Sequence, residues 1–276
     1  MGKIIAFTNQ KGGVGKTTTC VNMSAYLAAM GKKVLIIDID PQGNASSGLG
    51  VVKRTLTKSI YNCFVSDCAP EDAILKTSVN NLEIIPSNID LAGAEVDLVY
   101  MNNREKVLKG ILTRLRNNYD YITVDCPPSL GLLTINALTS CDSVFIPIQG
   151  EFYALEGLSQ LMNTVKLVKK HLNPNLEIEG VVLTMYDSRS NLIQTVAEEI
   201  HKFFGKKVFI TKIPRNVRLG ESPSYGLPIM QFDPRSSGAI AYKKLTEELL
   251  ERNSDSYEKI TKDYLLRKKA VPADKE

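Results

Sequence analysis

A glycine-rich turn near the N-terminus constrains the fold of this chain more than any other feature of its sequence. An apolar run, Lys3–Thr8, leads into the turn, and a helical pattern over Val21–Ala28 follows, with Gly31 placed to end the helix. A strand, a glycine turn and a helix in this order are typical of a phosphate-binding loop, because glycines let backbone N–H groups converge on phosphates at a helix N-terminus. The sequence therefore predicts that a nucleoside triphosphate binds the turn formed by Lys11, Gly12, Gly13, Val14, Gly15, Lys16, Thr17 and Thr18.

Two lysines distinguish this loop. Lys16 is expected to reach the β- and γ-phosphates, and the adjacent Thr17 hydroxyl is expected to ligate Mg²⁺. Gln10 stands where the standard pattern has a glycine, and Lys11 directly precedes the glycine pair. Lys11 has two open interpretations: a solvated surface lysine, or a second cation that stabilises charge developing in phosphoryl transfer. The second interpretation lets Lys11 reach nucleotide held by another subunit, and so predicts a nucleotide-dependent homodimer.

Apolar runs alternate with longer helical patterns along the chain, which predicts an α/β fold. Several runs are apolar throughout, as expected for parallel strands covered on both faces. We therefore expect a doubly wound, mainly parallel sheet flanked by helices. Without an internal repeat or a Gly/Ser-rich linker, residues 1–252 are expected to form a single domain, and residues 253–276 a C-terminal helix and polar tail. Besides Lys3–Thr8, the predicted strands are Lys33–Asp38, Leu82–Pro86, Tyr121–Asp125, Ser143–Pro147, Glu179–Met185 and Val208–Ile213.

Two of these strands end in aspartates. Asp38 ends one strand and Asp40 follows it, whereas Asp125 ends another and precedes a Pro-Pro turn. Ligands of doubly wound sheets gather at the carboxyl ends of strands. We therefore expect Asp38 or Asp40 to orient water or Mg²⁺, and Asp125 to support Mg²⁺ directly or through water.

Composition narrows the class of protein further. No apolar run approaches the length of a bilayer, and Ile4–Phe7 is too short for a signal-peptide core, so a cytoplasmic protein is expected. The five cysteines include no C-x-x-C pair, which disfavours a disulfide framework or a metal site built on them. A net charge of +4 permits nucleic-acid binding without requiring it.

Taken together, the motifs resemble the ParA/MinD group of P-loop ATPases, which is marked by a deviant Walker A loop with an additional lysine. Lys11–Thr18 is similar to that loop, Asp38–Ser46 to switch I and Asp125–Ser129 to switch II. The resemblance spans about residues 3–250. Segments that resemble the chromosomal ParA (Soj) members of the group are Glu151–Gly157, Thr184–Arg189 and Ile213–Gly226.

The resemblance implies an ATPase that partitions DNA, in chromosome or plasmid segregation, with ATP and Mg²⁺ as ligands. Lys11 would contact nucleotide across an ATP sandwich dimer, Asp40 would position the attacking water, and Asp125 would couple the γ-phosphate to the dimer interface. Pro214 and Asn216 match positions that contact adenine.

For partners, the resemblance implies non-specific double-stranded DNA and a ParB-type centromere-binding protein. Arg189 and Arg218 match family positions that hold DNA in the ATP-bound dimer. Phosphate contacts of this kind give salt-sensitive, sequence-independent binding. The ParB-type protein would stimulate a weak intrinsic ATP hydrolysis, which releases the DNA, and the ATPase would be associated with the nucleoid.

Two alternatives belong to other classes. A MinD-like, membrane-associated ATPase of division-site placement would need a C-terminal basic amphipathic helix. Acidic residues dilute the short stripe available for it, so a packed terminal helix is favoured; the stripe is Tyr257, Ile260, Tyr264 and Leu265. A metabolic enzyme, such as a dethiobiotin-synthetase-like ligase or a nitrogenase-type reductase, is the second alternative. Cys126 and Cys141 lack the pattern of the reductase cluster, and the sequence identifies no small-molecule pocket.

Overall fold

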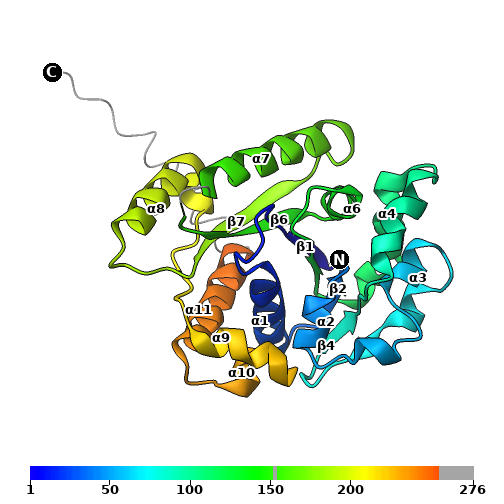
Figure 1. Cartoon of the computed structure of the whole chain (residues 1–276), viewed down its shortest axis with the longest axis horizontal. Helices are drawn as coiled ribbons and strands as arrows, with labels where there is room; N and C mark the ends of the chain where they lie inside the picture. The colour runs from blue at the N-terminus through cyan, green and yellow to red at the C-terminus, as the bar shows by residue number, and fades with distance from the viewer. Residues whose placement is uncertain (152–153, 255–276) are drawn as a thin grey trace.

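A twisted sheet of mainly parallel strands forms the centre of the computed structural model, which describes residues 1–151 and 154–254 (Figure 1). Within these ranges the sheet has 7 strands in the order β3-β4-β2-β5-β1-β6-β7. Neighbouring strands are parallel except β3 and β4, which confirms the predicted doubly wound sheet. The strands are β1 (Lys3–Phe7), β2 (Val34–Asp38), β3 (Leu75–Lys76), β4 (Leu82–Ile85), β5 (Tyr121–Asp125), β6 (Ser143–Gln149) and β7 (Glu177–Thr184).

Helices cover both faces of the sheet, and each face has its own apolar core (Figure 1). One face packs against α1 (Lys16–Ala29), α2 (Asn44–Gly48), α9 (Val217–Glu221), α10 (Ile229–Phe232) and α11 (Ser237–Arg252). The other face packs against α3 (Ile60–Phe64), α4 (Leu91–Val99), α5 (Val107–Leu115), α6 (Leu132–Ser140), α7 (Ala154–His171) and α8 (Asn191–Phe204).

The strand β2 shows why the apolar runs are continuous. Val34 and Ile36 belong to the core beneath α1, whereas Leu35 and Ile37 belong to the opposite core. Successive side chains of a strand point to opposite faces, so a strand covered on both sides buries every residue. All five residues of β2 are accordingly buried.

One predicted strand is wrong. Val208–Ile213 lies beside β7 and touches it at a bridge between Val208 and Val181, but it does not extend the sheet. The backbone N–H groups of Ile210 and Thr211 donate instead to the carboxylate of Glu248 on α11, at 2.8 and 2.9 Å. Phe209 and Ile213 still donate to the β7 carbonyls of Val181 and Leu183, at 2.8 and 2.9 Å, but the N–H groups of the residues between them are bound by a side chain and continue no ladder. Conversely, β3 was not predicted, because two residues are too few to show a period.

The C-terminal prediction is largely outside the described residues. Helix α11 ends at Arg252, and of the predicted C-terminal helix and tail only residues 253 and 254 are described. The apolar stripe weighed for membrane binding, 257–265, also lies outside them. Among the helices that the structure describes, none is both long and apolar enough to cross a membrane.

Candidate functional site

The glycine turn connects β1 to α1 at the carboxyl edge of the sheet. Gly13 and Gly15 have φ angles of +74° and +83°, in a region that residues with a Cβ rarely adopt. Gly15 is the N-cap of α1 and no side chain caps the helix there, which leaves its first N–H groups to a ligand. The loop is also held by the end of β7, because the Thr184 hydroxyl donates to the Val14 carbonyl at 2.8 Å.

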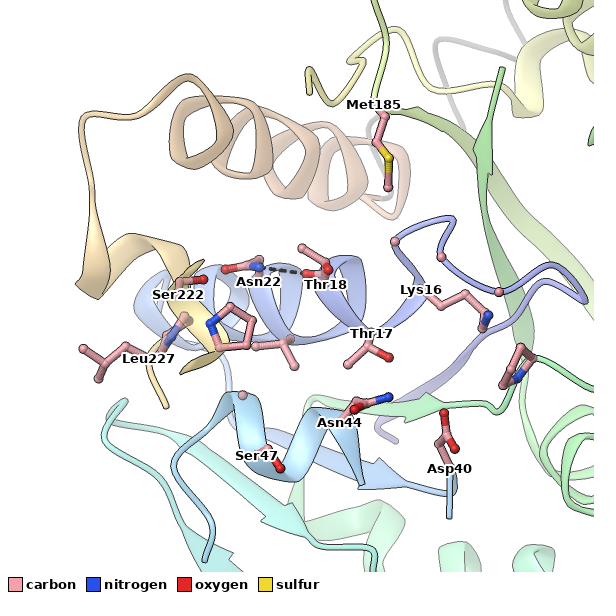
Figure 2. Close-up of a pocket in the computed structure, with 18 residues that line it drawn as sticks. Lys16, Thr17, Thr18, Asn22, Asp40, Asn44, Ser47, Met185, Ser222 and Leu227 are labelled. Carbon is pink, nitrogen blue, oxygen red and sulfur yellow. Dashed lines mark hydrogen bonds between the residues drawn. The ribbon is translucent and has the colours of Figure 1, made fainter. Parts of the chain in front are cut away.

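A cleft of about 380 Å³ opens beside this turn and along α1. In Figure 2, Lys16, Thr17 and Asp40 gather at one end of the cleft, and Ser222 and Leu227 lie at the other. The structure thus brings together most of the predicted phosphate site. The predicted residues that line the cleft are Gly12, Gly13, Gly15, Lys16, Thr17, Thr18 and Asp40.

Sequence reasoning missed Asn22, which lines the middle of the cleft. Its amide nitrogen donates to the Thr18 carbonyl at 2.8 Å, and its amide oxygen accepts from the Ile229 backbone N–H at 2.7 Å. The side chain therefore fixes the start of α10 against the side of α1 that lines the cleft. A buried asparagine within an otherwise apolar stretch of helix was the available signal.

The two lysines of the loop have different surroundings. Lys16 is 6% exposed, and its Nζ donates to the Lys11 carbonyl at 3.0 Å. Burial lowers the pKa of Lys16, while Asp125 and Asp40 raise it. The Lys11 ammonium forms an ion pair with Glu151, and Lys11 is absent from the described residues that line the cleft. Its contact with the nucleotide of a partner stays a prediction.

Asp38 and Asp125 lie opposite one another on β2 and β5, and both are fully buried. The Asp38 carboxylate accepts three hydrogen bonds, from the Ser46 N–H (2.9 Å), the Ser46 hydroxyl (2.7 Å) and the Asp40 N–H (3.1 Å). Burial raises the pKa of Asp38 to about 6 in spite of these donors. The carboxylate thus holds switch I, and its predicted part in binding Mg²⁺ gains no support from this arrangement.

Asp125 differs because its carboxylate oxygens make no close hydrogen bond within the described ranges, although the Thr17 hydroxyl lies near enough to affect its pKa. Burial raises its pKa well above the ordinary value and Asp38 raises it further, whereas the Thr17 hydroxyl and Lys16 lower it. A buried, unpartnered carboxylate beside a threonine hydroxyl fits a magnesium ion, which takes one or two carboxylates together with substrate phosphates. The described residues hold no cluster of three or more His, Cys, Asp or Glu that could bind a metal without such phosphates.

Asp40 is buried and lines the cleft. Its carboxylate accepts from the Gln42 N–H at 2.9 Å, and its carbonyl accepts from the Gly43 N–H at 2.8 Å, which closes a tight turn. Lys53 donates to the Gln42 carbonyl at 2.6 Å and holds the turn from outside. The geometry therefore presents the Asp40 carboxylate at the phosphate end of the cleft, as its predicted role requires.

Comparison with known proteins identifies the family. A family model described as an AAA domain matches residues 2–178. The sporulation initiation inhibitor protein Soj of Bacillus subtilis is 61% identical over 249 residues, which cover 90% of this chain and 98% of that protein. The chain belongs to the Soj/ParA family of partitioning ATPases. The chromosome partitioning protein ParA of Myxococcus xanthus is 50% identical over 254 residues, 92% of this chain and 90% of its own.

Among solved structures, cobyrinic acid a,c-diamide synthase from Mycobacterium smegmatis with bound ADP and magnesium is similar to this Soj/ParA member. The TM-score is 0.81 at 36% identity, and the match covers 91% of this chain and 95% of that one. The name is that of a metabolic enzyme, but the identity to the partition proteins is higher. The family predicted from the motifs is thus confirmed.

In this Soj/ParA chain, Pro214 and Asn216 are not among the described residues that line the cleft. Pro214 bridges to Tyr186 beside the end of β7. Asn216 is the N-cap of α9: its oxygen accepts from the Arg218 N–H at 2.8 Å, and its nitrogen donates to the Ser237 hydroxyl at 2.8 Å. Their contact with adenine stays a prediction.

Arg189 and Arg218, the predicted DNA-binding residues, are both exposed and both paired with acids. Arg189 follows β7 in the loop before α8, and forms an ion pair with Asp187 at 2.7 Å. Arg218 lies on α9 and forms ion pairs with Glu221 at 2.8 Å and Asp233 at 3.5 Å. The loop that carries Arg189 meets the segment that leads into α9 where Tyr186 bridges to Pro214.

Proposed function

We propose that this chain is an ATP-dependent DNA-partitioning ATPase that hydrolyses ATP with Mg²⁺ in chromosome or plasmid segregation. Family membership supports the class of function, and the buried, unpartnered carboxylate of Asp125 is the observation that carries the chemistry. Burial raises the pKa of this carboxyl group and so makes its ionised form costly, and its place beside the phosphate loop favours a cation as its ligand.

Each residue at the phosphate end then has a part in binding or orientation. The N–H groups of the glycine turn and Lys16 bind phosphate oxygens, and Lys16 exchanges its contact with the Lys11 carbonyl for them. Thr17 and Asp125 would hold Mg²⁺, which neutralises phosphate charge when bound. Asp40 would accept a hydrogen bond from the attacking water and orient it toward the terminal phosphate.

The proposal extends to partners. Lys11 is one-third exposed and contacts Glu151 outside its own cleft, which is compatible with reaching nucleotide in a second copy. ATP would close that homodimer, and Arg189 and Arg218 of both copies would then hold duplex DNA without sequence preference. A ParB-type partner would stimulate a weak intrinsic hydrolysis and so release the DNA.

The test is size-exclusion chromatography of the Asp40→Ala variant with ATP, with and without duplex DNA. Slowed hydrolysis should leave an ATP-bound dimer that retains DNA. The same variant carrying Arg218→Glu should dimerise without retaining DNA, and a Lys16→Ala chain should do neither. A monomeric Asp40→Ala variant in ATP would contradict the role of Asp40, and unchanged DNA retention by Arg218→Glu would contradict the DNA surface.

The MinD-like alternative has a separate test. Sedimentation with liposomes in ATP should show no binding by the full chain and no difference after truncation at Arg252. ATP-dependent sedimentation that the truncation abolishes would favour membrane association instead.

A further inference from the structure

The guanidinium of Arg189 is already engaged by a carboxylate of its own loop. Its Nε donates to one oxygen of Asp187 at 2.9 Å, and its Nη2 donates to the other at 2.7 Å. The backbone N–H of Arg189 donates to Asp187 as well, at 3.0 Å. The result is a two-point fork of the kind by which arginine binds carboxylates and phosphates.

This fork uses the side of the guanidinium that suits a phosphate. Two parallel N–H donors in one plane match two oxygens of a phosphate as well as they match two of a carboxylate. A DNA phosphate that takes this edge of Arg189 must therefore displace Asp187. The Arg189 side chain is 87% exposed and Asp187 is 38% exposed, so the edge is accessible to DNA without rearrangement of the fold.

Asp187 also interacts electrostatically with a second cation, Arg215. The Tyr186 N–H donates to the Ile213 carbonyl at 2.9 Å, which places the Asp187 loop beside Arg215. The hydrogen bonds from Arg189 lower the pKa of Asp187 to about 2, and Arg215 contributes in the same direction. The carboxylate is therefore ionised throughout the neutral range and opposes two exposed arginines.

We propose that Asp187 is an intramolecular competitor of DNA: its carboxylate occupies the phosphate-binding edge of Arg189 and sets how weakly the chain holds duplex DNA. This inference rests on the proposed DNA-binding function and concerns how that function is regulated. Binding becomes an exchange of ion pairs, in which a backbone phosphate replaces Asp187. Such an exchange keeps DNA contacts short-lived, as a protein that must release DNA after each hydrolysis requires.

The decisive variant is Asp187→Asn in the Asp40→Ala background with ATP. An asparagine keeps the size of the side chain but removes the competing charge. We expect affinity for a random-sequence duplex to rise about threefold per protomer, or about tenfold for a dimer that uses both loops. The slope of log affinity against log salt should also steepen, because binding to the variant no longer frees a carboxylate that takes up a cation as the phosphate arrives.

Asp72→Asn is the matched control, because Asp72 also forms an exposed ion pair, with Lys58 at 2.9 Å, and its loss changes net charge equally. That variant should leave DNA affinity almost unchanged. The mutant cycle is completed by Arg189→Ala alone and with Asp187→Asn. Without Arg189, the Asp187 substitution should lose most of its effect.

The possible outcomes distinguish a failure of the Asp187 proposal from a failure of the proposed DNA-binding function. If Asp187→Asn lowers DNA affinity, Asp187 orients Arg189 for DNA, and the proposal that Asp187 competes with DNA is wrong. If the background variant binds DNA through Arg189 but Asp187→Asn changes neither affinity nor salt slope, only the inference fails. A background variant that retains no DNA in ATP contradicts the proposed function and the inference together.

Discussion

Asp38 and Asp125 end neighbouring parallel strands, lie in register with one another and are both fully buried. Asp38 accepts three hydrogen bonds from Ser46 and Asp40, whereas both oxygens of Asp125 are unpartnered within the described ranges. Residue type, strand end and burial are thus shared, and only the supply of internal donors differs.

The difference assigns separate tasks to the two carboxylates. A carboxylate that accepts hydrogen bonds from the protein holds the segment that donates them in place. For Asp38 that segment is switch I. A carboxylate without close hydrogen bonds destabilises the ligand-free fold, because its desolvation is offset only in part. Three changes, taken from the largest expected effect to the smallest, test this contrast.

Asp125→Asn should have the largest effect. We expect Mg²⁺-dependent ATP affinity to fall roughly 10- to 100-fold, since the carboxylate that would hold the ion is gone. The ligand-free protein should become more stable, because a neutral amide replaces a carboxyl group whose ionised form is penalised by burial. Calorimetric titration and thermal unfolding with and without ATP and Mg²⁺ measure both. A variant that keeps the full thermal shift on adding ATP and Mg²⁺ would contradict the assignment.

The pH dependence of stability should reveal the raised pKa of Asp38. Its pKa rises from an ordinary value of 3.8 to about 6 on folding. Between these values the folded chain binds more protons than the unfolded chain, so the free energy of unfolding falls as pH rises. A shift of this size corresponds to about 2–3 kcal/mol. Urea unfolding of ligand-free protein from about pH 4.5 to 7 should show the fall. Asp38→Asn should lessen the fall without abolishing it, because the raised pKa of Asp125 contributes in the same direction. An unchanged slope in that variant would refute the contribution of Asp38.

Ser46→Ala should have the smallest effect. The Ser46 hydroxyl donates to Asp38 and accepts from the Ser87 N–H at 2.9 Å. Loss of this hydroxyl should lower the free energy of unfolding by about 1–2 kcal/mol. It should also shift the loss of stability to higher pH, because a donor that lowers the Asp38 pKa is missing. Ser47→Ala, one residue along α2, is the control and should leave the pH dependence unchanged.

Sequence spacing was sufficient for features made by neighbours in the chain. The glycine turn, α1 and the aspartates at the strand ends follow from local patterns, and the parallel sheet follows from continuous apolar runs. What escaped prediction depends on contacts between distant segments. Glu248 intercepts the N–H groups of Ile210 and Thr211 from 38 and 37 residues away. Only folding places Glu151 beside Lys11, 140 residues earlier.

The sequence positions of Asp38 and Asp125 do not predict that the two carboxylates have different roles either. The distinction comes from Ser46, which returns to Asp38 only because the turn after Asp40 reverses the chain into α2. Closeness in sequence does not guarantee that a contact can be predicted. Asp187 and Arg189 are two residues apart, but their paired hydrogen bonds depend on the conformation of the loop.

The hydrogen bond from Thr184 to the Val14 carbonyl joins the phosphate loop to the end of β7. Five residues beyond Thr184 stands Arg189, and between them Met185 has a φ of +49°, a strained conformation for a residue with a side chain. We expect a displacement of the glycine turn by ATP to reach the arginine loop along this short stretch of backbone. Thermodynamic reciprocity then applies: to whatever extent ATP strengthens the binding of DNA, DNA must lower the dissociation constant of ATP by the same factor.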